Sequence, residues 1–272
     1  MKKKSSSWRT RPGRASSWPR GTEAVRVPRI YHPAPMRSGE TCRLDERATR
    51  HVVSVLRLRP GAPVILFNGR GGEYLGTLTQ ASRHGAGVRI DTFQPVAVES
   101  PIHIILAQGI SRGERMDYTL QKAVELGVAD INPLLTERCT VKLAGERLEK
   151  RHQHWRGVIV HASEQSGRDR IPGLAPTRTF FQWLALPHEG EGIFLDPEAT
   201  CTLTELQRPS KPLTLVIGPE GGLAPEEKRQ LEKRGFRAVR LGPRILRTET
   251  AGMAALAVIQ ALWGDFTPVP RA

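Results

Sequence analysis

The pattern of hydrophobic and polar positions divides the chain into two parts near residue 96. Upstream, short apolar runs alternate with turn sequences such as Pro60-Gly61, which predicts a small β-rich unit over residues 23–95. The apolar runs lie at residues 25–27, 64–67, 74–78 and 88–90. One helix is expected among them, with an apolar face formed by Ala48, Val52, Val55 and Leu56. The pattern therefore favours a compact β-barrel that carries one helix.

Downstream of residue 96, apolar runs of strand length alternate with stretches of helical period. This alternation predicts an α/β fold with a parallel sheet over residues 96–268. Strands are expected at residues 102–107, 128–135, 193–195, 213–217 and 237–241. Helices are expected at residues 116–127, 146–163, 225–234 and 249–263. The last of these helices is apolar on all sides and must be covered on all sides, which predicts a second subunit against it.

Composition and charge narrow the class of protein. The 272 residues are 39% hydrophobic and contain no apolar run of about 20 residues, which excludes a transmembrane helix. The formal net charge is +14, and residues 1–30 hold nine basic residues against one acid, a net +8. Such an excess favours a polyanionic partner, because each neutralised phosphate releases counterions. Residues 1–22 lack an apolar period and are expected to form a disordered basic extension.

Cysteine and histidine residues give no sign of a disulfide framework or a metal site. Cys42, Cys139 and Cys201 are far apart in the sequence, so neither a disulfide framework nor a CxxC zinc site can be built from them. This fits a reducing cytosol, and a cytoplasmic location is expected. His152 and His154 are two positions apart on an expected helix and point to different faces, so no metal is predicted.

Two loops near the C-terminus concentrate the candidate chemistry. A glycine-rich segment at residues 218–222 follows a buried strand, and ligands of α/β sheets bind beyond the carboxyl ends of strands. It matches neither GxGxxG nor a phosphate-binding loop, and a bare Gly-Gly pair is also typical of an ordinary strand–helix turn. A second loop at residues 241–251 holds two arginines, a carboxylate and two hydroxyls. This composition would be explained if Thr248 or Thr250 caps the following helix and the charged side chains are solvated. However, two arginines, Arg244 and Arg247, beside the start of a buried helix favour a binding site.

These two loops resemble the cofactor loops of the SPOUT methyltransferases, whose C-terminal chain forms a deep trefoil knot. Within that superfamily the sequence is most similar to the ribosomal small-subunit methyltransferase E family, over about residues 26–266. Besides GPEGG at 218–222 and LGPRILRTETA at 241–251, the similarity includes, in order, residues 51–57, 59–61, 67–69, 122–128, 137–139, 141–143 and 164–168. The departures are the basic N-terminal extension and Ala224, where a capping Ser is more typical.

The resemblance implies a fold, an activity and an assembly. The expected architecture is an N-terminal PUA-like β-barrel for RNA, followed by a SPOUT α/β domain with a deep C-terminal trefoil knot, in a homodimer. The family methylates N3 of a uridine in 16S rRNA of the small ribosomal subunit, with S-adenosylmethionine as the methyl donor. The residues carried over for that cofactor are Leu195, Gly218, Pro219, Glu220, Gly221, Gly222, Leu241, Gly242, Ile245, Leu246 and Thr250.

Methylation of N3 also needs groups that remove a proton and bind RNA. The imide proton must leave, because a neutral N3–H has no lone pair with which to attack. The candidate bases are Glu249, Glu220 and Glu164; Glu220 could instead hold its own loop, and Glu164 could cap a helix. The candidates to hold phosphate or to stabilise charge on the uracil oxygens are Arg112, Arg168 and Arg247. Arg247, Glu249 and Glu164 form the expected catalytic set, and RNA contacts are also expected from Arg57 and Arg59.

Two other functions remain open from the sequence. A SPOUT 2′-O-ribose methyltransferase would share the cofactor loops, although the N-terminal unit and residues 164–168 favour methylation of a base. A non-catalytic RNA-binding assembly factor could keep the same fold, although the complete pair of loops argues against it.

Overall fold

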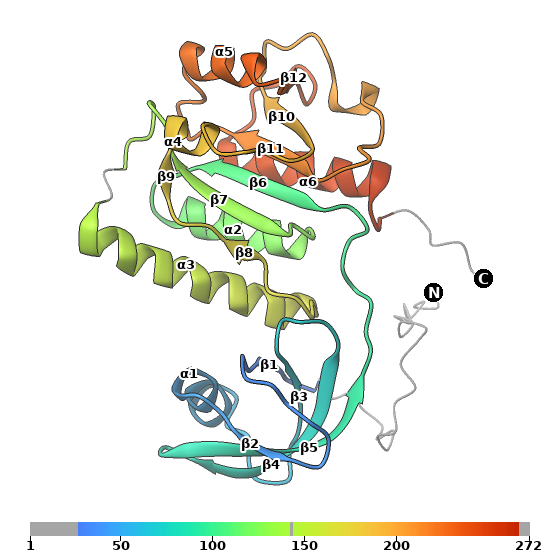
Figure 1. Cartoon of the computed structure of the whole chain (residues 1–272). Helices are drawn as coiled ribbons and strands as arrows, with labels where there is room; N and C mark the ends of the chain where they lie inside the picture. Colours follow the sequence, from blue (N-terminus) through green and yellow to red (C-terminus); the bar gives the residue numbers. More distant parts are fainter. Residues whose placement is uncertain (1–26, 142–143, 267–272) are drawn as a thin grey trace, which may run out of the picture.

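The computed structural model describes residues 27–141 and 144–266, which form a small β-rich domain and a larger α/β domain (Figure 1). The expected basic extension at residues 1–22 lies outside the described residues. The same holds for Val25, Arg26, Lys142 and Leu143, which belong to predicted or matched segments. In the part of the chain that is described, no helix is both long and apolar enough to cross a membrane.

The N-terminal domain is a five-stranded sheet in the order β1-β3-β4-β5-β2. Its strands are β1 (Arg29–Tyr31), β2 (Thr41–Arg43), β3 (Pro63–Phe67), β4 (Glu73–Ser82) and β5 (Gly85–Gln94). β1 and β3 pair in parallel, and the other neighbours are antiparallel. Alternate positions point inward, so Val64, Leu66, Leu78, Val88 and Ile90 join Ala48 and Val52 in one core.

The helix of this domain departs from the sequence prediction at Val55. Helix α1 (Glu46–Arg50) continues as a π-helix, η1 (His51–Val55). There the Leu56 N–H donates to the carbonyl of His51, five residues back, at 2.9 Å. The wider turn shifts the apolar stripe, and Val55 is 65% exposed although it was expected to face the core. Ala48 and Val52, in the preceding turns, are buried as predicted.

The C-terminal domain has a seven-stranded parallel sheet in the order β12-β10-β11-β6-β7-β8, with β9 also paired to β7. Its strands are β6 (Ile104–Gly109), β7 (Asp130–Leu135), β8 (Gly173–Leu174), β9 (Arg178–Thr179), β10 (Glu191–Leu195), β11 (Leu213–Ile217) and β12 (Arg237–Val239). The predicted parallel sheet is therefore confirmed. The strand predicted at residues 102–107 begins two residues later, at Ile104, and Ile102 and His103 precede it.

Helices cover both faces of this sheet (Figure 1). They are α2 (Glu114–Glu125), α3 (Gly145–Ser166), α4 (Phe180–Leu184), α5 (Pro225–Lys233) and α6 (Thr248–Trp263), with a short 3-10 turn, η2 (Leu203–Glu205). Leu215 and Ile217 of β11 face the core shared with α2, α3 and α6. Val216 between them packs with residues of α4 and α5. The continuous apolar run of β11 is thus that of a strand buried on both faces.

The two domains are joined by hydrogen bonds between β1, the turn before β4 and the end of α3. The guanidinium of Arg29 donates to the carbonyl of Arg168 at 3.1 Å, and the Gly72 N–H donates to the carboxylate of Asp169 at 2.7 Å. The Tyr31 N–H donates to the carboxylate of Glu164 at 2.9 Å. These contacts fix the N-terminal domain against the C-terminal end of α3.

Candidate functional site

A cleft of about 990 Å³ lies at the carboxyl ends of neighbouring strands β10, β11 and β12. Its walls come from the two loops singled out in the sequence. Ten of the eleven residues expected to bind the cofactor line this cleft: Leu195, Gly218, Pro219, Glu220, Gly221, Gly222, Leu241, Gly242, Ile245 and Leu246. Thr250, the eleventh, is not part of the lining; it lies in the first turn of α6 and is exposed.

The glycine-rich loop needs its glycines because the backbone folds back on itself. A Cβ at Gly218 would lie 2.6 Å from the carbonyl carbon of Gly222 and 2.7 Å from the nitrogen of Leu223. Gly222 has φ +70°, a conformation that side chains disfavour. The neighbouring strand β6 makes room as well, since a Cβ at Gly109 would lie 2.6 Å from Pro219. The loop can therefore bring backbone groups close to a ligand.

A buried hydroxyl joins the two loops. Thr248 donates from Oγ1 to the carbonyl of Gly218 at 2.6 Å, and Gln108 donates from Nε2 to Thr248 Oγ1 at 3.2 Å. The idea that Thr248 caps α6 is wrong, because the N-cap is Arg247 and no side chain caps that end. Gln108 is fully buried on β6, and no pattern in that apolar strand marks it as a site residue.

Arg247 and Glu249 of the expected catalytic set both line the cleft. Arg247 is exposed at the start of α6, and Glu249 is half-buried two residues further on. Oε2 of Glu249 is buried and accepts no hydrogen bond from any residue that the structure describes. A buried carboxylate oxygen without a partner inside a cleft is a strong acceptor for a proton or a donor group of a ligand.

Glu220 holds its own loop, which was the alternative left open from the sequence. Its carboxylate accepts the N–H of Arg112 at 2.9 Å and the guanidinium of Arg115 at 3.1 Å. Burial acts to raise the pKa of Glu220, but these donors outweigh it and hold the pKa below its ordinary value. Glu220 therefore links the glycine-rich loop to the loop before α2, and its carboxylate is a weaker base than an unpaired one.

Glu164 lies at the junction of the two domains and does not line the cleft. It is 8% exposed, and Tyr31, Arg47 and His161 all donate to it or pair with it. Burial acts to raise its pKa, but the donors lower it to about 2. Because so acidic a group is a poor base and the structure places it away from Arg247 and Glu249, Glu164 is better explained as a structural anchor.

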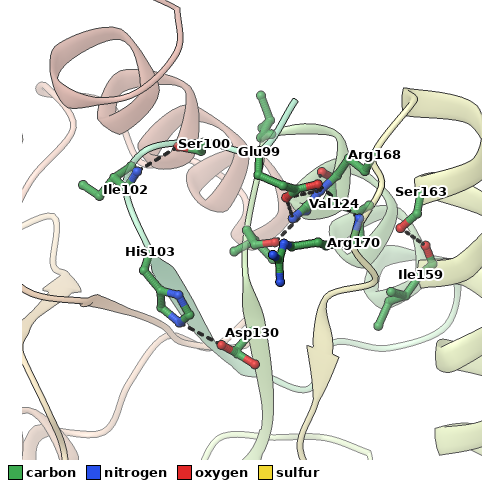
Figure 2. Close-up of polar contacts among 12 residues, drawn as sticks. Glu99, Ser100, Ile102, His103, Val124, Asp130, Ile159, Ser163, Arg168 and Arg170 are labelled. Carbon is green, nitrogen blue, oxygen red and sulfur yellow. Dashed lines mark hydrogen bonds and ion pairs between the residues drawn. The ribbon is translucent and has the colours of Figure 1, made fainter. Parts of the chain in front are cut away.

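Arg168, expected to contact RNA, is buried (Figure 2). Its guanidinium pairs with Glu99 and donates to the carbonyls of Val124 and Val128, at 3.1 Å and 2.6 Å. The same Glu99 accepts the N–H of Arg170 at 3.3 Å. A buried arginine engaged in this way is not presented to a phosphate in this conformation, so the structure gives the RNA contact expected of Arg168 no support.

The other arginines expected to bind RNA are exposed. Arg57 and Arg59 lie on the N-terminal domain just after η1, and Arg57 has a positive φ of 52°. Arg112 lies beside the glycine-rich loop, held through its backbone by Glu220. Arg138, at the carboxyl end of β7, lines the cleft although it was not selected as a site residue. The motif that carried the family resemblance at residues 137–139 was the available signal.

Comparison with known proteins identifies the domains. The model of an RNA methyltransferase domain matches residues 98–260, and that of an RNA methyltransferase PUA domain matches residues 44–91. Ribosomal RNA small subunit methyltransferase E of Buchnera aphidicola from Schizaphis graminum is 33% identical over 89% of this chain and 99% of its own length. The Mycobacterium tuberculosis protein of the same name is 32% identical over 78% of this chain and 83% of its own length.

Solved structures agree with this assignment. Ribosomal RNA small subunit methyltransferase E from Neisseria gonorrhoeae, bound to S-adenosyl methionine, is 41% identical with a TM-score of 0.84 and covers 89% of this chain and 100% of its own. A Legionella pneumophila methyltransferase, also in complex with that cofactor, is 41% identical with a TM-score of 0.86 and the same coverage. The matched domains, a PUA domain followed by an α/β methyltransferase domain, place the chain among the RNA methyltransferases. The chain belongs to the ribosomal RNA small subunit methyltransferase E family.

Proposed function

We propose that this protein transfers a methyl group from S-adenosylmethionine to N3 of a specific uridine in 16S rRNA, on the small ribosomal subunit in the cytoplasm. The observation that carries the proposal is the cleft itself. Two loops far apart in sequence, tied together by Thr248, wall a cavity at the carboxyl ends of β10 and β11. The names and the bound cofactor of the similar proteins support the substrate and the donor.

The cleft suits a sulfonium nucleoside. The tight turn of the glycine-rich loop, which a Cβ at Gly218 would disrupt, brings backbone groups to the cleft wall, where they could hydrogen-bond an adenosine moiety. Leu195 and Leu241 offer apolar walls. When bound, the cofactor supplies a methyl group that is already activated for transfer. The residues of the chain must then align N3 of the uracil with that methyl group and accept the imide proton of N3.

Glu249 is the base in this proposal. Of the three candidates, Glu164 lies outside the cleft and Glu220 is engaged by Arg112 and Arg115, whereas Glu249 has a buried oxygen without a described partner. The uracil N3–H would donate to this carboxylate and lose its proton to it as the bond to the methyl group forms. By accepting that proton, the carboxylate leaves the electron pair of the N3–H bond on N3, and this pair forms the bond to the methyl group.

Arg247 stabilises the negative charge that develops on the uracil oxygens. It lines the cleft two residues before Glu249, and no carboxylate pairs with its guanidinium in the described chain. A fixed positive charge close to the oxygens lowers the cost of removing the imide proton. Arg112, exposed beside the glycine-rich loop, would hold a phosphate of the same RNA.

The proposed assembly is a homodimer of knotted subunits. The chain returns from β12 at the sheet edge to pack α6 against α2 and β11, and such a return supports the trefoil knot of the family. α6 buries Ala255, Leu256 and Ile259 against its own domain. Its other positions remain partly or fully accessible although they are apolar: Met253, Ala254, Ala257, Val258 and Leu262. A second copy against this face would complete the cover that an all-apolar helix needs.

Nucleoside mass spectrometry tests the function. We expect 16S rRNA from cells that lack the gene to lose 3-methyluridine, and the purified protein with S-adenosylmethionine to restore it on small subunits from those cells. Loss of a ribose-methylated nucleoside instead would show a 2′-O-methyltransferase. An unchanged rRNA together with no cofactor binding in calorimetry would favour a non-catalytic assembly factor.

A further inference from the structure

Arg138 lies against the outer side of the glycine-rich loop. It belongs to the segment 136–141 that follows β7, and its Nη1 donates to the carbonyl of Gly221 at 2.9 Å. A Cβ placed at Gly221 would lie 3.1 Å from Cβ of Arg138 and 3.5 Å from its Cδ, so the aliphatic stem covers that glycine. The guanidinium is therefore held at the wall of the cleft rather than free to swing through solvent.

A buried carboxylate fixes the segment that carries Arg138. Glu227, 1% exposed on α5, accepts the N–H of Glu137 at 2.9 Å and the N–H of Ala224 at 2.8 Å. One carboxylate thus ties the residue before Arg138 to the N-cap of α5, Ala224, just after the glycine-rich loop. Because charge-assisted hydrogen bonds inside a protein are strong, this link sets the position of Arg138 relative to that loop.

The positive charge of Arg138 is not neutralised by the protein. Two neighbouring cations in the cleft lining have carboxylate partners, since Arg115 pairs with Glu220 and Lys228 with Asp196. Arg138 makes no ion pair with any residue between 27 and 141 or between 144 and 266. Its one recorded bond, to Gly221, uses one of the five N–H donors of a guanidinium. A fixed arginine with free donors at a cleft wall is suited to an anion.

We infer that Arg138 binds a phosphate of the RNA next to the target nucleotide, and thereby positions that nucleotide over the cleft. This inference rests on the proposed function. RNA is favoured over a small anion deep in the cleft because Arg138, Gly221 and Glu220 are all exposed at the rim. The net charge of +14 also suits a polyanion. Glu227 acts as a positioning residue, through the segment that it anchors.

The salt dependence of RNA binding tests this role. Filter binding of the full chain to unmethylated small subunits, between about 50 and 200 mM KCl at fixed Mg²⁺, gives the slope of log K against log salt. We expect Arg138→Gln to weaken binding about ten-fold and to reduce the slope by about one, because one phosphate contact is lost. Arg138→Lys should retain most of the slope. Arg208→Gln, which removes an exposed arginine outside the cleft lining, should leave it unchanged.

The outcomes separate the inference from the function on which it rests. An Arg138→Gln variant with the wild-type slope overturns the RNA contact, and a weaker affinity for S-adenosylmethionine at that unchanged slope would assign Arg138 to the support of Gly221 alone. Failure of the proposed function appears in the wild-type protein, as an absence of 3-methyluridine on small subunits in the same preparation. This test of the proposed function uses the wild-type protein and needs no Arg138 variant.

Discussion

The hydroxyl of Thr248 donates to the carbonyl of Gly218, 30 positions earlier in the chain, at 2.6 Å. Thr248 begins α6 and Gly218 follows β11, so this single bond sets the separation of the two loops that wall the cleft. Both groups are buried, and Gln108 donates to the same hydroxyl at 3.2 Å. A buried carbonyl without a hydrogen-bond donor is destabilising, because its desolvation free energy is no longer offset. Loss of the Thr248 hydroxyl should therefore disturb the Gly218 loop.

Replacement of Thr248 by valine should weaken cofactor binding. Valine keeps the shape of the side chain but leaves the carbonyl of Gly218 without a donor. We expect a rise of about ten-fold in the dissociation constant of S-adenosylmethionine, which corresponds to about 1.4 kcal/mol. Titration calorimetry measures it directly. Thr248→Ser keeps the hydroxyl and should bind as wild type does; equal binding by the valine and serine variants would show that the hydrogen bond does not shape the site.

Gly218→Ala should distort the loop that walls the cleft. The new Cβ would lie 2.6 Å and 2.7 Å from backbone atoms of Gly222 and Leu223, which cannot rotate away as a side chain can. We expect the affinity for S-adenosylmethionine to fall at least ten-fold, about the effect of a 1–3 kcal/mol overpacking penalty. Gly157→Ala is the matched control. A Cβ there meets nothing within 4 Å, so this helical change should stabilise the fold by up to about 1 kcal/mol and leave affinity intact.

The fold was largely predictable from the spacing of apolar residues. Strands such as β11 read as short continuous apolar runs because both of their faces are buried, and the bounds of 213–217 agree with the structure. Val55 was placed on the wrong side because a helical period of 3.6 was assumed, whereas η1 is a π-helix with a wider turn. No pattern of hydrophobic residues distinguishes these two windings over five residues.

The part of the site that is formed by backbone could be predicted from the sequence. The part that depends on which side chains pair with each other could not. The glycine-rich loop carries its signal in its composition, so Gly218 and Gly222 were found. Arg168 and Glu164 were selected as charged residues of a matched motif, yet they are buried and paired at the domain junction. Their partners Glu99 and Arg47 lie 69 and 117 positions away in sequence. A single sequence does not reveal pairs of that separation.

Glu249→Gln should slow methyl transfer without loss of cofactor binding. Glutamine is nearly isosteric with glutamate but cannot accept the N3 proton, and a positioned general base contributes roughly 100-fold or more to rate. We expect kcat to fall by at least that factor, with the affinity for S-adenosylmethionine within about two-fold of wild type. Transfer of a tritiated methyl group to small subunits measures kcat. Glu189→Gln, an exposed position outside the cleft, should retain full activity; retention of activity by Glu249→Gln would move the base to another residue.

Arg247→Ala should abolish methyl transfer in a protein that remains folded. Arg247 is exposed at the cleft, so the loss of its guanidinium leaves no buried group without a partner. We expect an unfolding transition within about 0.5 kcal/mol of wild type. Methyl transfer to small subunits should be undetectable, because the charge on the uracil oxygens is no longer stabilised. Near-normal turnover by this variant would remove Arg247 from the reaction.

Arg168→Met should destabilise the fold rather than act on RNA directly. The change removes the ion pair of Glu99, which keeps only the N–H of Arg170, and takes one donor each from the carbonyls of Val124 and Val128 (Figure 2). We expect the free energy of unfolding in urea to fall by about 3–5 kcal/mol, as when one partner of a buried ion pair is removed. The exposed Arg59→Met should change stability by no more than about 0.5 kcal/mol. A stable Arg168→Met protein with weakened RNA binding would restore the contact predicted from sequence.

Glu164 should stabilise the domain junction in a pH-dependent manner. Its pKa is about 2 in the folded protein against an ordinary value of 4.5, so the folded state favours the charged form. The contribution to stability is therefore complete above pH 4.5 and is lost as the pH falls towards 2. The size of the shift corresponds to a contribution on the order of 3 kcal/mol at neutral pH.

Urea unfolding of Glu164→Gln and wild type at pH 7 and pH 3 measures that contribution. The difference in unfolding free energy between the two proteins should be largest at pH 7 and smaller by about 2 kcal/mol at pH 3. At pH 3 Glu164 is protonated in the unfolded chain, whose ordinary pKa is 4.5, whereas it stays mostly charged in the folded protein, so unfolding takes up a proton and costs less. Glu46→Gln is the matched control, since Glu46 pairs with Arg50 at a side chain that is 88% exposed. Its effect should be small at both values. A Glu164→Gln difference that does not change with pH would mean that the carboxylate charge does not hold the two domains together.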